Sequence, residues 1–142
     1  MGEGRPDHLS KKEKIRRFGE VFTPQHIAEQ MCDALPDEAW EPGTTFLEPT
    51  CGDGVFVLEI LRRKFARCRS RKDYTEALRS VYAMELQTDN VQATIEAVTK
   101  LCEETFPLTR AEREIIENHI IQADSLKVMR MMNELNEKEK NV

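Results

Sequence analysis

The sequence predicts an α/β domain in which a parallel sheet is covered by crossover helices. Three short apolar segments with strand character alternate with amphipathic segments of helical period along the 142-residue chain. An acid stands near the end of each strand segment: Glu48, Glu85 and Asp124. Alternation of this kind predicts parallel strands, and right-handed crossovers order them 3-2-1.

The first predicted helix covers residues 24–35. Thr23 offers a capping hydroxyl and Pro24 occupies the first helical position. Apolar residues recur every four positions after it and predict its buried face: Ile27, Met31 and Leu35. The stretch "PDEAWEPG" ends this helix.

The remaining elements follow in order. Residues 44–49 are the first strand candidate, and residues 55–65 form a helix that is apolar over most of its first two turns. Residues 80–86 make the second strand, and an amphipathic helix follows it, marked by Val91, Ile95, Val98 and Leu101. Thr109 and Glu112 form a capping box for a short helix. Residues 119–124 are the third strand candidate, followed by a Met-rich helical segment through Leu135.

Length and composition limit the chain to one domain with a highly charged exterior. We expect a polar arm at residues 1–20, a folded domain at 21–135 and a charged tail at 136–142. The net charge of −5 argues against nucleic-acid binding by bulk electrostatics but leaves room for a local basic patch. No apolar run reaches the roughly 18 residues that span a bilayer, and no secretory signal opens the chain. The four cysteines are scattered, which favours reduced thiols in the cytoplasm and no metal site.

The stretch "FLEPTCGDGVF" joins the first strand to the next helix through two glycines, Gly52 and Gly54. Glycines at such a turn either serve its backbone conformation or let a ligand approach the backbone closely. The dinucleotide-binding pattern requires a third glycine at position 57, where Val57 stands. The chain also has no Gly-Lys-Ser/Thr, which excludes a P-loop.

The acids at the ends of the three strands favour a ligand site at that glycine turn over a purely conformational role. Carboxyl ends of parallel strands meet at one edge of the sheet, where ligands of open α/β sheets bind. Glu85 can accept both hydroxyls of a ribose, although an acid at a strand end can also be merely solvated. Asp124 can accept from an adenine amino group, or simply cap the helix that follows. Together the three acids predict a nucleoside-shaped ligand.

Four successive segments resemble motifs of the adenine-N6 DNA methyltransferases of restriction-modification systems. They are "GEVFTPQHIAEQM", "FLEPTCGDGVFVLEI", "YAMEL" and "QADSL", and the resemblance covers about residues 18–126. It implies a Rossmann-like methyltransferase half-sheet and S-adenosylmethionine as the cofactor. The specificity lies in the order of the motifs, since each one is short.

The resemblance implies a role for each matching residue. The segment before the first strand would pack against the methionine end of the cofactor; it comprises Phe22, Thr23 and Pro24. The loop after the first strand would pass close under the methionine; it contributes Glu48, Pro49, Gly52 and Gly54. The remaining residues would hold the nucleoside: Glu85 the ribose, Leu86 the adenine ring, and Asp124 with Ser125 the adenine amino group. Glu48 stands where the family usually has Asp.

The same family carries an Asn-Pro-Pro-Tyr-type tetrapeptide that holds the flipped-out adenine, and this sequence has none. We therefore assign no catalytic residue to this chain and expect it to be inactive on DNA alone. The chain ends about where a fourth strand would begin, so one edge of the first strand would be unpaired. We expect a partner chain with the remaining strands, or self-association through that edge.

Two other functions remain open. A degenerate methyltransferase-like module could act as a protein-binding or regulatory subunit, and a methyltransferase acting on RNA or protein would share the glycine loop and the ribose acid. The basic stretch "RRKFARCRSRK", residues 62–72, is either a solvated helix end or a surface that contacts phosphates.

Overall fold

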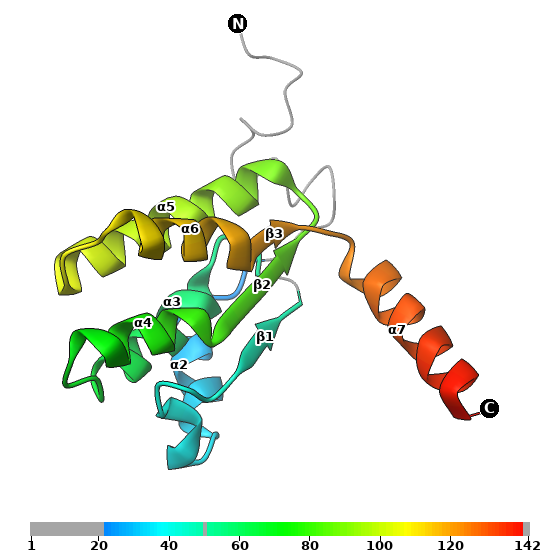
Figure 1. Cartoon of the computed structure of the whole chain (residues 1–142), viewed down its shortest axis with the longest axis horizontal. Helices are drawn as coiled ribbons and strands as arrows, with labels where there is room; N and C mark the ends of the chain where they lie inside the picture. The colour runs from blue at the N-terminus through cyan, green and yellow to red at the C-terminus, as the bar shows by residue number, and fades with distance from the viewer. Residues whose placement is uncertain (1–21, 50, 141–142) are drawn as a thin grey trace, which may run out of the picture.

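The computed structural model describes residues 22–49 and 51–140, so the polar arm expected at residues 1–20 lies outside the described part of the chain. The chain forms a small parallel sheet and the helices that connect its strands (Figure 1). In chain order the elements are α2 (Gln25–Asp33), the 3₁₀ helix η2 (Asp37–Trp40), β1 (Phe46–Glu48), α3 (Val55–Phe65), α4 (Arg71–Arg79), β2 (Val81–Glu85), α5 (Thr88–Thr105), α6 (Arg110–His119), β3 (Ile120–Gln122) and α7 (Ser125–Lys140).

The sheet confirms the predicted fold class and strand order. Its strands lie in the order β1-β2-β3 and both pairs are parallel, which is the predicted 3-2-1 read from the opposite edge. Phe46 is paired with Val81, and Ala83 with Ile120. Because β2 is flanked on both sides, it is the most buried of the three strands.

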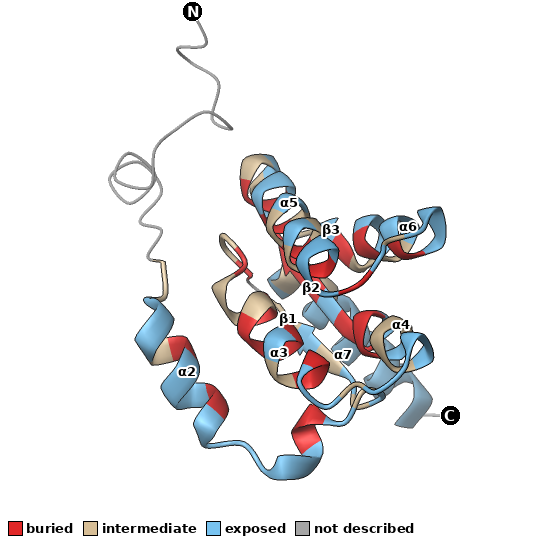
Figure 2. Ribbon diagram, turned by 90° about the vertical axis from the view of Figure 1, so that its left-hand side faces the viewer, coloured by how far each residue is buried: buried red, intermediate tan, exposed pale blue. Residues whose placement is uncertain are grey.

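The connecting helices pack on one face of the sheet. Both crossovers advance across the sheet in the same direction, and right-handed crossovers of this kind put their helices on the same side. The strand residues that point to that side belong to the apolar core: Phe46, Val81, Ala83 and Ile120. On the helices, the buried residues face inward toward them (Figure 2). The neighbouring positions Leu47, Tyr82 and Ile121 point to the other face and are exposed.

A buried lysine fixes the chain just before β1. Lys64 of α3 is fully buried, and its ammonium donates to the backbone carbonyls of Glu41, Pro42 and Thr44 at 2.7, 3.2 and 2.6 Å. Removal from water lowers the pKa of Lys64 to about 8. The three bonds satisfy the buried charge and set the direction in which the chain enters β1.

Helix α2 buries a different face from the one predicted. Met31 and Leu35 are 55% and 41% exposed, while Ala28 and Cys32 are buried. The small residues allow α2 to lie close against α3, which the larger side chains would prevent. The helix also begins one residue later than predicted: Pro24 is the N-cap with extended backbone, and no side chain caps it.

Helix α4 was not predicted from the sequence. The first crossover contains two helices, because the chain turns after α3 and starts again at Ser70. The hydroxyl of Ser70 accepts from the backbone N–H of Asp73 at 3.2 Å, and the Asp73 carboxylate accepts from the N–H of Arg69 at 2.9 Å. This reciprocal cap was a readable start signal inside the basic stretch. The capping box of Thr109 and Glu112, in contrast, was predicted and is confirmed.

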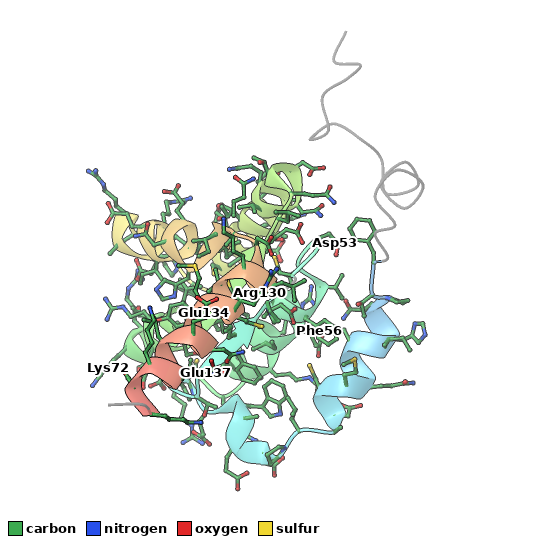
Figure 3. All side chains as sticks on the ribbon, turned by 90° about the vertical axis from the view of Figure 1, so that its right-hand side faces the viewer. Asp53, Phe56, Lys72, Arg130, Glu134 and Glu137 are labelled. Carbon is green, nitrogen blue, oxygen red and sulfur yellow. The ribbon has the colours of Figure 1, made fainter. Side chains whose placement is uncertain are left out.

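Helix α7 leads away from the end of β3 and has no buried residue (Figure 1). It continues to Lys140, beyond the predicted end at Leu135, because the glutamates and lysines after Leu135 are good helix formers. Arg130, Glu134 and Glu137 form one polar face of the helix (Figure 3). An apolar stripe lies beside that face and is largely exposed; it consists of Val128, Met129, Met131, Met132 and Leu135.

Candidate functional site

The carboxyl ends of the three strands meet at one edge of the sheet, as predicted. Strands β1 and β2 end at the acids Glu48 and Glu85, and Asp124 lies two residues after the end of β3. Glu85 is paired in register with Gln122, while Glu48 lies level with Ala83, two residues earlier along β2. Glu48 and the adjacent Pro49 are partly exposed, so the end of β1 is accessible.

Glu85 is the centre of this edge. Its side chain is buried, with only 4% of the residue exposed. One carboxylate oxygen, Oε1, accepts from the backbone N–H of Gly52 at 3.2 Å. The other, Oε2, accepts from the backbone N–H of Gln87 at 2.8 Å and from the amide of Asn90 at 3.4 Å. The acid therefore ties the loop after β1 to the start of α5, and Oε1 retains capacity for a further donor.

The glycine loop is anchored on two sides. The N–H of Cys51 donates to the carbonyl of Met84 at 2.9 Å, which extends the pairing of β1 and β2 beyond the strand. The hydroxyl of Thr94 on α5 donates to the carbonyl of Gly52 at 3.3 Å and lies 3.7 Å from the sulfur of Cys51. Burial raises the pKa of the Cys51 thiol to about 11, so this cysteine is a packing residue rather than a nucleophile.

The two glycines of the loop serve different purposes. Gly54 has φ +93° and caps α3, and a Cβ there would lie 3.0 Å from Cγ2 of Thr94. It is therefore required for packing α3 against α5. Gly52 also has a left-handed φ, +54°, but among residues 22–49 and 51–140, its chain neighbours aside, the nearest atom to a Cβ there would be in the ring of Phe22, at 3.8 Å. The described residues therefore leave room for a ligand on the side of Gly52 that lacks a side chain.

Phe22 comes to this loop from a segment far away in sequence. Its ring lies 3.8 Å from the position that a Cβ of Gly52 would take. The neighbouring Thr23 is partly exposed and Pro24 is exposed. The structure therefore brings together two of the segments that the sequence marked as one site, although they are thirty residues apart.

Asp124 acts as a helix cap. Its Oδ1 accepts from the backbone N–H groups of Leu126 and Lys127 at 3.1 and 3.2 Å, at the start of α7. This was the alternative that the sequence left open for this acid. Ser125 begins α7 and is partly exposed, and Leu86 is exposed after the end of β2.

Two buried polar residues of α5 belong to the site and were missed from the sequence. Asn90 contacts Glu85, and Thr94 contacts the glycine loop, both from the buried face of the helix. Their signal was a pair of polar residues four positions apart, one helical turn, on the side of α5 that carries Val91 and Val98. Polar side chains on a buried face require partners, and here those partners are the site itself.

Within residues 22–49 and 51–140, no three histidine, cysteine or acidic side chains are grouped so as to hold a metal ion. Over the same residues, no helix combines the length and the apolar character that a membrane span requires.

The edge as a whole presents carboxylate acceptors beside an open glycine backbone and an aromatic ring, which suits a ligand with hydroxyl groups and positive charge. The fold is an α/β domain, and the strand ends form its candidate ligand site. The type II methyltransferase M.VspI of Vibrio sp. (strain 343) is 40% identical to the chain over 50 residues, which are 35% of this chain and 12% of that protein. The chain is thus related to a methyltransferase along this stretch. No family model matches the chain, and no solved structure matches it.

Proposed function

We propose that this chain is the S-adenosylmethionine-binding portion of an adenine-N6 DNA methyltransferase of the restriction-modification type. The observation that carries the proposal is the convergence of Gly52, Glu85 and Phe22 at the carboxyl edge of the sheet. These residues come from three separate segments that resemble successive motifs of those enzymes. The similarity to a type II methyltransferase supports the same class.

The residues at this edge fit the cofactor. Of the described residues beyond its chain neighbours, only Phe22 comes within 4 Å of a Cβ at Gly52, so the backbone there can approach a ligand closely. Glu85 stands at the end of β2, and Oε1 can accept from a ribose hydroxyl while it holds the N–H of Gly52. The ring of Phe22 borders the same space with Thr23 and Pro24 behind it in sequence. Leu86, Asp124 and Ser125 lie farther along the edge, where the adenine would be held.

Charge supports the same assignment. When bound, S-adenosylmethionine supplies an electrophilic methyl group on a positively charged sulfur. Glu48 at the end of β1 places a carboxylate where the ammonium and sulfonium would lie, and opposite charges at short range stabilise each other. These residues would position the methyl group for attack. Holding two reactants in the correct geometry supplies a large part of the lowering of the activation barrier in a transfer between two substrates.

A second portion would supply the rest of the site. We propose that an adenine-binding tetrapeptide and the DNA-recognition surface come from further sequence or from a partner chain, so that sequence-specific binding of DNA needs the two portions together. Among the described residues, β1 pairs only with β2, which leaves its other edge for additional strands. A second copy of the chain at this edge is the alternative association. We expect a cytoplasmic protein.

Calorimetric titration of the purified chain with S-adenosylmethionine tests the proposal. We expect saturable binding, and a loss of at least about tenfold in affinity for Glu85→Gln, because an amide cannot accept at both of its ends. Glu96→Gln is the matched control, since Glu96 is an exposed acid of the next helix. Absence of binding, or equal loss in both variants, would overturn the assignment of the site.

The second candidate is a methyltransferase-like module that binds protein and no cofactor. The observation that favours it is the exposed apolar face formed by Leu47, Tyr82 and Ile121. Thermal unfolding with and without S-adenosylmethionine separates the two candidates. A rise in melting temperature supports the cofactor-binding portion, and an unchanged melting temperature at saturating ligand supports the module.

A further inference from the structure

The basic stretch of residues 62–72 is mostly neutralised inside the fold. Arg62 and Arg63 pair with Glu59 of the same helix, and Arg63 also reaches Asp33 of α2. Arg67 pairs with Glu41 at 3.0 Å, and Lys64 is buried. Beyond these residues, the cations of the stretch are Arg69, in the loop before α4, and Arg71 and Lys72 on α4 itself.

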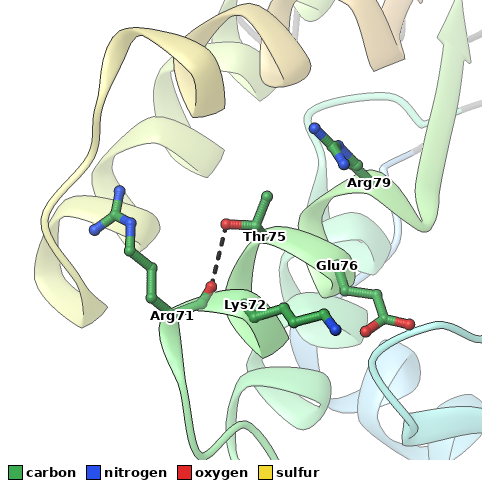
Figure 4. Close-up of a pocket in the computed structure, with 5 residues that line it drawn as sticks. All are labelled: Arg71, Lys72, Thr75, Glu76 and Arg79. Atoms are coloured by element: carbon green, nitrogen blue, oxygen red, sulfur yellow. Dashed lines mark hydrogen bonds between the residues drawn. The ribbon is translucent and has the colours of Figure 1, made fainter.

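Helix α4 carries a hollow of about 590 Å³ lined by Arg71, Lys72, Thr75, Glu76 and Arg79 (Figure 4). These positions are spaced by one, three or four residues, so they share one side of the helix. Three of the five are cations and one is an acid. Most of the lining is exposed, so the hollow opens to solvent.

One wall of the hollow is held in place. Arg71 pairs with the buried Glu112 of α6 at 2.6 Å, and its guanidinium lies 5.8 Å from the ring centre of Phe106. The hydroxyl of Thr75 donates to the carbonyl of Arg71 at 3.1 Å (Figure 4). Arg71 still has donors to spare, since a guanidinium carries five N–H groups. Lys72 and Arg79 form no ion pair with any residue of 22–49 or 51–140.

The shape and lining of the hollow favour a chain of phosphates over a small molecule. Small-molecule sites are enclosed and lined mainly by apolar residues, whereas this hollow is open and four of its five lining residues are charged. Lys72 and Arg79 are seven residues apart on the helix, which is about 10 Å along its axis. Cations at that separation can contact successive phosphates of one strand more readily than a single phosphate.

We propose that this side of α4 is a docking surface for the phosphodiester backbone of DNA, contacted by Lys72, Arg79 and the spare donors of Arg71. The choice of DNA rests on the proposed function. The end of α4 leads directly into the start of β2, so the surface lies at the opposite end of the strand from Glu85 (Figure 1). It would therefore hold DNA outside the target site, by a contact that carries no sequence information.

Fluorescence anisotropy of the full chain with a labelled 20-base-pair duplex at low salt tests the proposal. We expect the double variant K72E/R79E to bind several-fold more weakly and to lower the slope of log affinity against log salt by about 2, one for each lost phosphate contact. The control K100E/K138E changes the net charge equally at exposed positions on α5 and α7, and we expect it to retain the wild-type slope. Melting curves confirm that each variant is folded, and K72Q/R79Q replaces K72E/R79E if the charge-reversed double does not fold.

Glu76→Gln gives a test of the opposite sign. Removal of the one acid in the lining should tighten DNA binding, while Glu96→Gln on α5 should leave it unchanged. Competition with inorganic phosphate tests whether the hollow binds a single phosphate instead. If a low concentration of phosphate displaced the labelled duplex, the hollow would be a single-phosphate site and DNA docking would be overturned. Absence of DNA binding by the wild-type chain, or equal weakening in both charge-reversed doubles, would also overturn it. Binding of S-adenosylmethionine should be unaffected in each of these variants, so failure of this surface can be distinguished from failure of the cofactor site.

Discussion

The carboxylate of Glu85 accepts a hydrogen bond from the backbone N–H of Gly52 at 3.2 Å, so the end of β2 holds the loop that follows β1. The contact joins residues thirty-three positions apart. It means that the acid expected to bind a ribose also orders the glycine loop before any ligand arrives. A loop that is already ordered loses less conformational entropy on binding.

Glu85→Ala should release the loop. The amides of Gly52 and Gln87 would both lose their acceptor, and a lost hydrogen bond to a charged group costs roughly 1.5–3 kcal/mol. We expect hydrogen exchange at these two amides to accelerate at least about tenfold. Glu96→Ala is the control on the exposed side of α5. Unchanged protection at Gly52 would mean that Thr94 and Met84 hold the loop without the acid.

The two loop glycines should respond differently to alanine. Gly54→Ala combines a strained φ with a Cβ only 3.0 Å from Thr94, and we expect a loss of about 2–4 kcal/mol in the free energy of unfolding. Gly52→Ala has the strain without the clash and should lose about 1 kcal/mol. Urea unfolding measures both values. We expect the reverse order for S-adenosylmethionine affinity, because only the Cβ at Gly52 would lie on the open side. Equal unfolding losses would contradict the packing role of Gly54.

Glu112 should make the fold sensitive to acid. Burial alone raises its pKa, but bonds from the Thr109 hydroxyl, from backbone N–H groups and from Arg71 outweigh this and lower the pKa to about 2. Since the folded-state pKa lies below the ordinary value of 4.5, the stabilisation is complete above pH 4.5 and is lost as the pH falls toward 2. The contribution of ionised Glu112 to the free energy of unfolding is at most about 3 kcal/mol.

Glu112→Gln tests this dependence. The variant should be less stable than the wild type at pH 7, and its stability should fall less steeply between pH 4.5 and pH 2. Urea unfolding at each pH measures these stabilities. Glu117→Gln, an exposed acid of the same helix, should keep the wild-type profile. Identical profiles for wild type and Glu112→Gln would show that other carboxylates govern the acid transition.

The strands and their order could be predicted because each strand is short, apolar and followed by an acid, and because crossover handedness leaves few arrangements. The buried face of α2 could not be predicted in this way. Periodicity marked Met31 and Leu35, yet the helix packs through Ala28 and Cys32, since close contact between helices depends on the partner surface. Helix α4 was hidden because a run of basic residues conceals a start signal at Ser70.

The candidate site likewise has features that the sequence could predict and features that it could not. The convergence of Glu48, Gly52 and Glu85 on one edge follows from parallel topology, which alternation of strand and helix predicts. The bonds that saturate much of Glu85 do not follow from it, because Asn90 and the N–H of Gln87 reach the carboxylate only through the direction in which α5 begins. The capping of α7 by Asp124 is local, so the sequence could offer it as an alternative.

The uncovered face of the sheet should drive association of the isolated chain. Leu47 is 54% exposed on the edge strand β1, and Met132 is 56% exposed on the apolar stripe of α7. Contiguous exposed apolar residues mark interaction surfaces, and an unpaired strand edge adds free backbone donors and acceptors. We therefore expect size-exclusion chromatography with light scattering to give a mass above that of the 16.5 kDa chain as concentration rises.

The double variant L47K/M132K should shift the equilibrium toward the monomer, because charged side chains block both surfaces. The control Q92K/T105K adds the same charge at exposed positions of α5 and should associate like the wild type. A well-folded wild-type chain that stays strictly monomeric at high concentration would contradict association through this face, and the remaining apolar surface would then have to be covered by a different polypeptide.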